Sequence, residues 1–208
     1  MRWAKHGYEV FVGSRDLDKA KAAASKIQSI VGSSARVQGL VNQDAASKAD
    51  IIVVTVPFGA LPDTIKSLRP SIKTGQIVVN VTVPLETAVG GSATRTVGVW
   101  DGSAGEFASR FLPKGTRLVS AFNNISAESL NDLSKQVDCD VLVCGDDVDA
   151  KKVVMDLAKS IPGVHGIDAG PLNNSRTVEQ LTALLVSLNV RYGVKGAGLR
   201  ITGLASKT

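Results

Sequence analysis

The stretch Met1–Arg15 (MRWAKHGYEVFVGSR) decides how the rest of the chain is interpreted. Helix-forming residues precede Gly7, and a glycine in that position is a typical helix stop. The apolar run Tyr8–Val12 indicates a short buried strand, and the following Gly13-Ser14-Arg15 indicates a turn that carries a hydroxyl and a guanidinium. The chain is therefore expected to open with the end of a helix, a strand and a polar turn.

Helical and strand patterns alternate along the remainder of the 208 residues. Helices are predicted at Leu17–Ile30, Asn42–Lys48, Leu61–Leu68, Ala104–Phe111, Ala127–Leu133, Ala150–Ile161 and Ser175–Asn189. Strands are predicted at Arg36–Leu40, Asp50–Pro57, Gln76–Val81, Arg117–Ala121, Cys139–Cys144, Val164–Asp168 and Gly198–Thr202. This alternation predicts an α/β fold: a Rossmann-type doubly wound, mostly parallel sheet with a small C-terminal helical segment. The long loop Thr82–Asp101 interrupts the pattern, and loops of this length are usually functional.

Composition narrows the function classes. Lys and Arg number 24 and Asp and Glu 19, which gives a net charge of +5, and aromatic residues make up 4%. A mildly basic surface suits an anionic small molecule, but the basic residues form no stripe, so nucleic-acid binding is not expected. The two cysteines form no Cys-x-x-Cys pair, and no stretch has the length of a membrane span or a signal-peptide core. We expect a reduced, cytoplasmic protein with no membrane partner.

The turn after the first strand carries the clearest ligand signal. NAD-specific folds place an acidic residue at this corner for the ribose 2′-hydroxyl, whereas this chain has Ser14 and Arg15, with Lys19 one helical turn later. A hydroxyl, a guanidinium and an ammonium suit a 2′-phosphate, which favours NADP over NAD. A solvated helix start is the alternative, and capping by Asp16 is compatible with both interpretations.

Later strand ends carry proline or amide residues. Ligands bind outside the carboxyl ends of strands in open α/β sheets, so Phe58 after Pro57 packs either on a cofactor or in the core. The Val83-Pro84 pair follows the next strand, and Asn123-Asn124 follows the one after it. By contrast, the sequence offers no catalytic residue and no metal-ligand cluster, since His6 and His165 are isolated.

Several longer segments make a family recognisable. They are GSRDLDKA (13–20), NQDAA (42–46), VPF (56–58), VWDGSAGE (99–106), AFNNISA (121–127), CDVLVCGDD (139–147), DAGPLNNSRTVEQLT (168–182) and GAGLRITG (196–203). Over essentially its whole length the chain resembles the coenzyme F420H2:NADP oxidoreductases. The resemblance implies NADP contacts at Ser14, Arg15, Lys19, Phe58 and Val83, and contacts near the hydride-transfer cleft at Ala127 and Ala197. Pro84, Asn123 and Asn124 lie beside these positions and are expected to help hold the deazaflavin F420.

The resemblance also fixes the expected domains and partners. Residues 1–170 would form the NADP-binding domain, and residues 171–208 a C-terminal helix and strand that complete the deazaflavin cleft. NADP and F420 are the small molecules implied. The apolar helical stretch Thr177–Leu188 is a candidate homodimer face.

This chain departs from the family pattern in one place. Members begin with a strand and a glycine-rich phosphate loop, whereas Met1 falls within the helix that should follow that loop. An internal start codon or a shortened gene would explain this, and the pattern retained from Gly7 onward favours the first. The expected strand would lie between Tyr8–Val12 and Asp50–Val56, so its absence should leave two unpaired strand edges and weak NADP binding or none.

The implied reaction is direct hydride transfer between two ring carbons, which requires no acid, base or nucleophile. Two alternatives remain open. The chain could be an NADP-dependent reductase of another acceptor, such as a ferric or imine substrate. It could also be a non-catalytic binding or oligomerisation module, because the phosphate loop is missing from the pattern.

Overall fold

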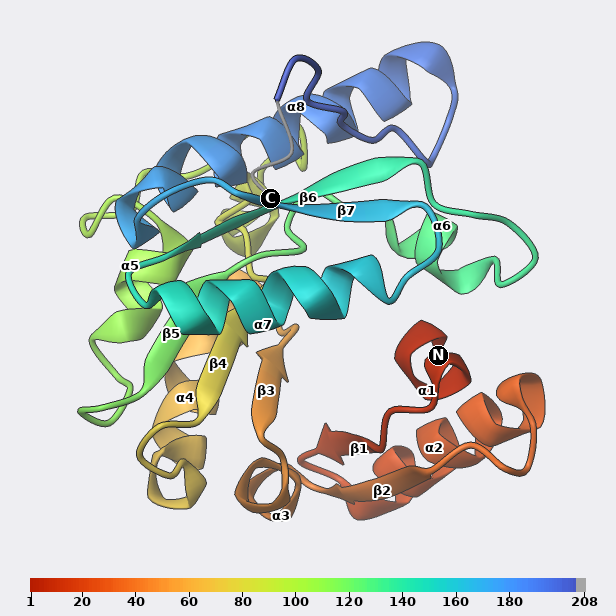
Figure 1. Cartoon of the computed structure of the whole chain (residues 1–208). Helices are drawn as coiled ribbons and strands as arrows, with labels where there is room; N and C mark the ends of the chain where they lie inside the picture. The colour runs from red at the N-terminus through yellow and green to blue at the C-terminus, as the bar shows by residue number, and fades with distance from the viewer. Residues whose placement is uncertain (205–208) are drawn as a thin grey trace.

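The computed structural model describes residues 1–204 and contains two sheets (Figure 1). A two-stranded parallel sheet pairs β1 (Val10–Ser14) with β2 (Val37–Val41). The second sheet has five strands in the order β3 (Ile51–Val54), β4 (Ile77–Asn80), β5 (Arg117–Ser120), β6 (Cys139–Gly145) and β7 (Val164–Asp168). Only the β5–β6 pair is antiparallel, so the predicted mostly parallel α/β sheet is confirmed.

Helices cover both faces of the larger sheet. The helices are α1 (Arg2–His6), α2 (Leu17–Val31), α3 (Asn42–Lys48), α4 (Leu61–Leu68), α5 (Ala104–Ser109), α6 (Ala127–Asn131), α7 (Val148–Lys159) and α8 (Ser175–Tyr192). Single 3₁₀ turns occur at Phe58–Ala60, Arg69–Ser71, Glu86–Val89 and Leu172–Asn174. Helix α7 packs on one face, and α4, α5 and α8 pack on the other. No helix in residues 1–204 is both long and apolar enough to cross a bilayer.

Strand β6 shows how the core is built. All seven of its residues are buried. Cys139, Val141 and Val143 join the core beneath α7, whereas Leu142 and Cys144 pack toward α8. The two cysteines thus point to opposite faces, as their spacing predicts. Burying one such valine contributes about 1.5–3 kcal/mol, which explains why a strand covered on both faces is apolar at nearly every position.

Local signals set several element boundaries. Asp16 caps α2 by accepting the amides of Asp18 and Lys19, and Asp147 caps α7 by accepting the amide of Ala150. Gly7 ends α1 at a φ of 102°, which is left-handed backbone that glycine adopts without strain. These boundaries agree with the helix and turn predicted at the start of the chain.

Helix α1 joins the two sheets. The Arg2 guanidinium donates hydrogen bonds to the carbonyls of Ser129, Leu130, Asp132 and Lys135 at 2.5–3.0 Å. The Trp3 indole donates to the Leu157 carbonyl at 3.1 Å. Because α1 leads directly into β1, these contacts tether the β1–β2 sheet to α6 and α7 of the larger sheet.

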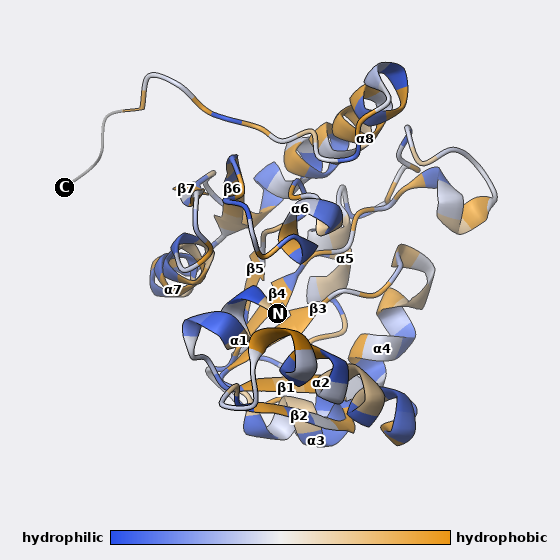
Figure 2. Cartoon of the chain, turned by 90° about the vertical axis from the view of Figure 1, so that its right-hand side faces the viewer, coloured by the Kyte–Doolittle hydropathy of each residue, from blue (hydrophilic) through white to orange (hydrophobic). Residues whose placement is uncertain are grey.

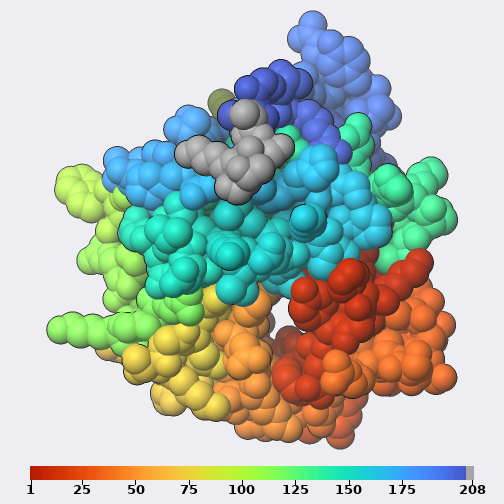
Figure 3. Space-filling view, in the orientation of Figure 1, coloured from red at the N-terminus to blue at the C-terminus, as the bar shows by residue number. Residues whose placement is uncertain are grey.

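Strands β1 and β3 do not pair. Within the described residues, no backbone hydrogen bond joins Val10–Ser14 to Ile51–Val54. A cavity of about 310 Å³ lies between the two strands, and the space-filling view shows an opening between the red N-terminal region and the orange segment beside it (Figure 3). The expectation that two strand edges are left unpaired is therefore confirmed.

The strand predicted at Gly198–Thr202 is wrong, because this segment is irregular. It does run beside β6, where the Leu199 carbonyl accepts the Asp140 amide at 2.7 Å. Two residues later, the Ile201 amide donates a hydrogen bond to the Asp140 carboxylate at 2.7 Å. A carboxylate therefore replaces the backbone partner that a strand ladder would need. The predicted domain division at residue 170 stays a prediction.

Candidate functional site

The carboxyl ends of β3, β4 and β5 are connected to α8 by a chain of hydrogen bonds. The Thr82 hydroxyl donates to the Val56 carbonyl at 3.0 Å, and the Asn123 amide donates to the Thr82 carbonyl at 3.3 Å. The Thr182 hydroxyl of α8 donates to the Asn123 carbonyl at 3.0 Å. Ligands of open α/β sheets bind outside these strand ends. This series of hydrogen bonds therefore fixes the relative positions of the segments that surround the expected site.

The first of two cavities at this edge has a volume of about 440 Å³ and is called the strand-end cavity here. Its walls come from the turns after β3 and β4, the segment Leu85–Ala88 and Thr182. Phe58 and Val83, two of the residues expected to contact NADP, both line it. The centroids of the Phe58 and Phe107 rings lie 5.7 Å apart, and Phe58 also packs against the core beneath α4. Phe58 therefore packs partly in the core and also lines a cavity, whereas its contact with a cofactor stays a prediction.

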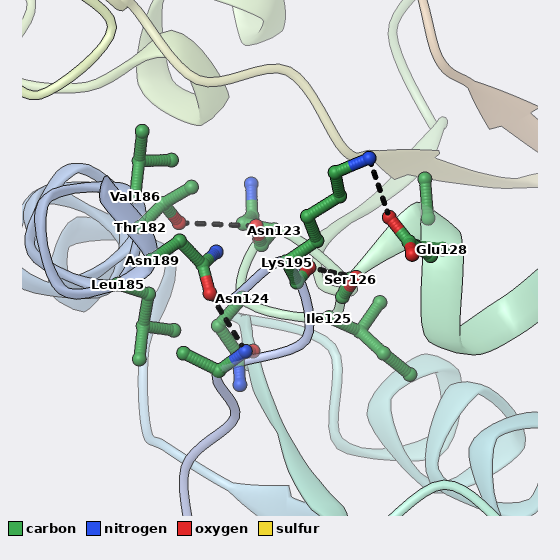
Figure 4. A pocket seen from close by; sticks show the side chains of 12 residues that line it. Asn123, Asn124, Ile125, Ser126, Glu128, Thr182, Leu185, Val186, Asn189 and Lys195 are labelled. Atoms are coloured by element: carbon green, nitrogen blue, oxygen red, sulfur yellow. Dashed lines mark hydrogen bonds and ion pairs between the residues drawn. The ribbon is translucent and has the colours of Figure 1, made fainter. Parts of the chain in front are cut away.

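The second cavity, the α8 cavity, has a volume of about 340 Å³ (Figure 4). It lies between the turn Asn123–Glu128, helix α8 and the segment that follows α8. Asn123, Ala127 and Ala197 line it, as does Thr182, which also lines the strand-end cavity. Both volumes fall in the range of small-molecule sites, and Thr182 stands where the two cavities meet.

The turn that separates β5 from α6 is backbone-strained. Phe122 has a φ of 62°, which is a left-handed conformation uncommon for an aromatic residue. The next two side chains are buried and bonded to backbone: Asn123 to Thr82, and Asn124 to the Asp140 carbonyl at 2.6 Å. The amides of Asn123 and Asn124 therefore fix the shape of the turn that lines the α8 cavity.

The corner after β1 presents cationic and hydroxyl groups. The Ser14 hydroxyl accepts the Asp16 amide at 3.1 Å, and the Lys19 ammonium lies 4.0 Å from the Asp16 carboxylate. Arg15 is exposed and makes no hydrogen bond or ion pair within residues 1–204. Its guanidinium is therefore available to an anion, whereas Asp16 is already engaged in capping α2.

The remaining expected residue, Pro84, is buried next to Val83 without lining either cavity. Its carbonyl accepts the Val97 amide at 2.8 Å, and this contact holds the long loop after β4. The sequence interpretation missed Thr182, although a threonine within the apolar pattern of α8 was an available signal.

A buried carboxylate secures α8 one turn before Thr182. Glu179 is 1% exposed, and its two oxygens accept the amides of Ala104 and Gly105 at 2.7 and 3.0 Å. Burial raises the pKa of Glu179 to about 7, although both amide hydrogen bonds oppose the shift. This contact fixes α8, and with it Thr182, against α5.

The segment after α8 is held by Arg200. Its guanidinium contacts Asp138 and Asp140 at 2.6 Å and donates to the Gly163 carbonyl at 2.7 Å. Burial tends to raise the pKa of Asp140, but the Ile201 amide and Arg200 hold it below its usual value. Since Ala197 lies three residues before Arg200, this anchor helps to close the α8 cavity.

The described residues include no evident metal site and no activated thiol. No group of three His, Cys, Asp or Glu residues in positions 1–204 is arranged to hold a metal ion. Both cysteines are buried, and burial raises the pKa of Cys144 to about 11, so its reactive thiolate is disfavoured. What this edge of the sheet offers is two cavities that share Thr182 in their linings.

The parallel strands, their strand-end cavities and the polar corner after β1 define an α/β protein of the Rossmann type. Residues 1–84 match the family model described as NADP oxidoreductase, coenzyme F420-dependent. The chain is 47% identical over 206 residues to the F420-dependent NADP reductase of Methanothermobacter thermautotrophicus, covering 98% of this chain and 88% of the relative. It is 45% identical over 207 residues to that of Methanocaldococcus jannaschii, covering 98% and 92%.

A solved structure agrees with the sequence relatives. The crystal structure of an F420-dependent NADP reductase candidate from Arthrobacter sp. FB24 superposes with a TM-score of 0.78 at 26% identity, covering 97% of this chain and 92% of that one. The chain belongs to the family of F420-dependent NADP reductases.

Proposed function

We propose that this protein transfers a hydride between the reduced deazaflavin coenzyme F420 and NADP. The observation that carries the proposal is the meeting of two ring-sized cavities at Thr182. Direct transfer needs two flat rings at contact distance, and a single side chain shared by both cavities is consistent with that arrangement.

The NADP end of the arrangement starts at the corner after β1. Arg15 and Lys19 would pair with the 2′-phosphate, and the Ser14 hydroxyl would donate to it. The dinucleotide would then cross the carboxyl edge of the sheet and place its nicotinamide in the strand-end cavity, against Phe58 and Val83. A dinucleotide lies across strand ends in this way in Rossmann-type folds.

The deazaflavin would lie in the α8 cavity, against the backbone of the turn Asn123–Ala127 and against Ala197. Small side chains at Ala127 and Ala197 leave room for a ring to approach closely. Asn123 and Pro84 would act by holding the turns that form the walls. Lys195 also lines this cavity and lies 3.9 Å from Glu128. Its ammonium would lie near the acidic glutamate tail that F420 carries.

The reaction balances without a protein acid or base. Reduced F420 gives two electrons and one hydrogen nucleus as a hydride to NADP⁺, which yields NADPH, oxidised F420 and one proton released to solvent. The protein's own contribution is to orient the two rings and exclude water between them.

A spectroscopic exchange assay tests the proposal. Reduced F420 is mixed with the protein and millimolar NADP⁺, and the absorbance of oxidised F420 is followed. We expect oxidised F420 to appear together with NADPH, faster with NADP⁺ than with NAD⁺. Oxidation of NADPH by an imine or ferric acceptor, with no exchange with F420, would favour the alternative reductase and contradict the proposal.

The assembly and the location of the protein are part of the same proposal. We propose a cytoplasmic homodimer that uses Thr177–Leu188 of α8, because Leu184 on this helix is 53% exposed. The proposed division assigns residues 1–170 to NADP and residues 171–208 to completing the deazaflavin cleft. Sedimentation of the wild type and Leu184→Glu tests the dimer: only the wild type should sediment as a dimer.

A further inference from the structure

Residues 193–198 (GVKGAG) connect the end of α8 to the stretch of chain that runs beside β6. They form neither helix nor strand, and three of the six are glycines. Figure 2 shows the chain leaving the end of α8 and then running toward β6 and β7. All six residues are exposed except Ala197, which is half-buried and lines the α8 cavity. Ala197 is therefore the one position of this segment that turns inward.

Two side chains in residues 1–204 form hydrogen bonds with the backbone of the segment 193–198, one from each side of the α8 cavity. From the turn after β5, the Ser126 hydroxyl donates to the Lys195 carbonyl at 2.8 Å. From α8, the Asn189 side-chain oxygen accepts the Ala197 amide at 2.9 Å. Because glycine-rich backbone is conformationally permissive, the position of Ala197 depends strongly on these contacts.

Helix α8 presents one face to the cavity, and its polar members contact opposite walls. Four residues line the cavity from this face, at helical spacing: Thr182, Leu185, Val186 and Asn189. Thr182 donates to the Asn123 carbonyl, whereas Asn189 accepts from Ala197 (Figure 4). Thr182 and Asn189 lie about 10 Å apart along the helix axis. Thr182 therefore fixes the cavity at the strand ends, and Asn189 fixes it at the segment that follows α8.

We propose that Asn189 is a positioning residue for the F420 half of the reaction. By accepting the Ala197 amide, it holds Ala197 at the wall against which the deazaflavin would lie. The strand-end cavity and the corner after β1 do not include Asn189 or Ala197, so NADP binding should not depend on this contact. The role rests on the proposed function for the identity of the ligand, whereas the contact between Asn189 and Ala197 does not.

Three variants and amide hydrogen exchange, followed by NMR, test the contact without any ligand. Asn189→Leu removes the acceptor, and we expect the Ala197 amide to exchange at least about fivefold faster. Asn189→Asp keeps an acceptor oxygen and should restore slow exchange at Ala197. Gln180→Leu removes an amide from an exposed position of the same helix and should change nothing. The Val194 amide donates to the backbone carbonyl of Asn189 at 3.0 Å, so its exchange should stay constant in all variants.

Ligand affinities then test the role. Equilibrium dialysis should show F420 binding about fivefold more weakly to Asn189→Leu than to the wild type and to Gln180→Leu. Calorimetry should show equal affinity for NADP⁺ in all three. Unchanged exchange at Ala197, unchanged F420 affinity, or an equal loss of affinity for both ligands in Asn189→Leu would overturn the proposal. Wild-type protein that fails to bind F420 would instead overturn the proposed function, and the exchange of Ala197 would still show whether Asn189 holds it.

Discussion

The β1–β2 sheet and the β3–β7 sheet differ in how completely they are built. The hydrophobic cluster of the small sheet has three alanines and one valine as its buried members: Ala4, Ala24, Ala35 and Val37. The large sheet buries several valines on both faces and ties its strand ends together through Thr82 and Asn123. The strand-end cavity and the α8 cavity lie at the larger sheet, and the proposed phosphate-binding corner lies at the end of β1 in the smaller one.

This contrast shows that the proposed NADP site depends on how the two sheets are joined. A dinucleotide that reaches from Arg15 to Phe58 must cross the gap between β1 and β3. Helix α1 provides a link through Arg2 and Trp3, and it does so by side-chain contacts to α6 and α7. Four mutations test the parts of this arrangement separately. They change the α1 contacts, the buried carboxylate of α8, the corner after β1 and the residue shared by the two cavities.

The largest effect is expected from breaking the link. Arg2→Ala removes the donor for four carbonyls and should lower the free energy of unfolding by about 4 kcal/mol. Arg36→Ala is the control, because this exposed residue loses a single bond to the Gly7 carbonyl. Urea denaturation measures both. If Arg2→Ala costs no more than Arg36→Ala, then α1 does not join the sheets.

The second effect concerns pH and the large sheet. Glu179 has a pKa of about 7 in the folded protein and an ordinary value of 4.5. Folding favours the neutral form of the Glu179 carboxyl. The contribution of Glu179 to the free energy of unfolding is therefore fully present below pH 4.5 and is lost as the pH rises toward 7. The loss should reach about 3 kcal/mol.

Denaturant unfolding at several pH values checks this prediction. Glu179→Gln cannot titrate, so its stability should lack this component of the slope between pH 4.5 and 7, whatever its absolute value. A slope identical to that of the wild type would show that Glu179 does not titrate in this range.

The third effect tests the corner after β1. Arg15→Ala should reduce the preference for NADP over NAD by about 2 kcal/mol, or roughly thirtyfold, because one charge-assisted contact to the 2′-phosphate is lost. Lys21→Ala, an exposed change on the same α2 helix, should leave the preference unaltered. Calorimetric titration with both dinucleotides provides the ratio, and an unchanged ratio in Arg15→Ala would place phosphate recognition elsewhere.

The smallest effect is expected at the junction of the cavities. Thr182→Val preserves shape but removes the hydrogen bond to the Asn123 carbonyl, and it should slow exchange by about fivefold, or roughly 1 kcal/mol. Thr177→Val, an exposed change on the same helix, controls for helix propensity. Equal exchange rates in the two variants would mean that Thr182 only lines the cavities.

Much of the fold was accessible from local sequence signals. The capping residue Asp16 and the stop at Gly7 placed helix boundaries correctly, and α3 was predicted over its full range Asn42–Lys48. These signals act within one turn of the chain, which is why single-sequence reasoning detects them. The apolar strand β3 was found but is shorter than Asp50–Pro57, since its last residues leave the sheet.

Hydrogen bonds between residues far apart in the sequence could not be predicted from the sequence. The side chain of Asp140 replaces a backbone partner at Ile201, and no pattern in Gly198–Thr202 reveals that contact. The role of Thr182 depends on a hydrogen bond to Asn123, and the left-handed Phe122 is likewise set by tertiary packing. The sequence indicated residue types for the site, while their arrangement into two cavities required the fold.

Isotope transfer tests the central claim most directly. NADPH that carries deuterium at its transferable position is incubated in ordinary water with oxidised F420, once with the protein and once without it. Reduced F420 that retains the deuterium on its ring carbon is the expected result, with NADP⁺ formed in equal amount. Reduced F420 without the label, or no reduction in the sample that holds the protein, would contradict direct transfer between the two rings.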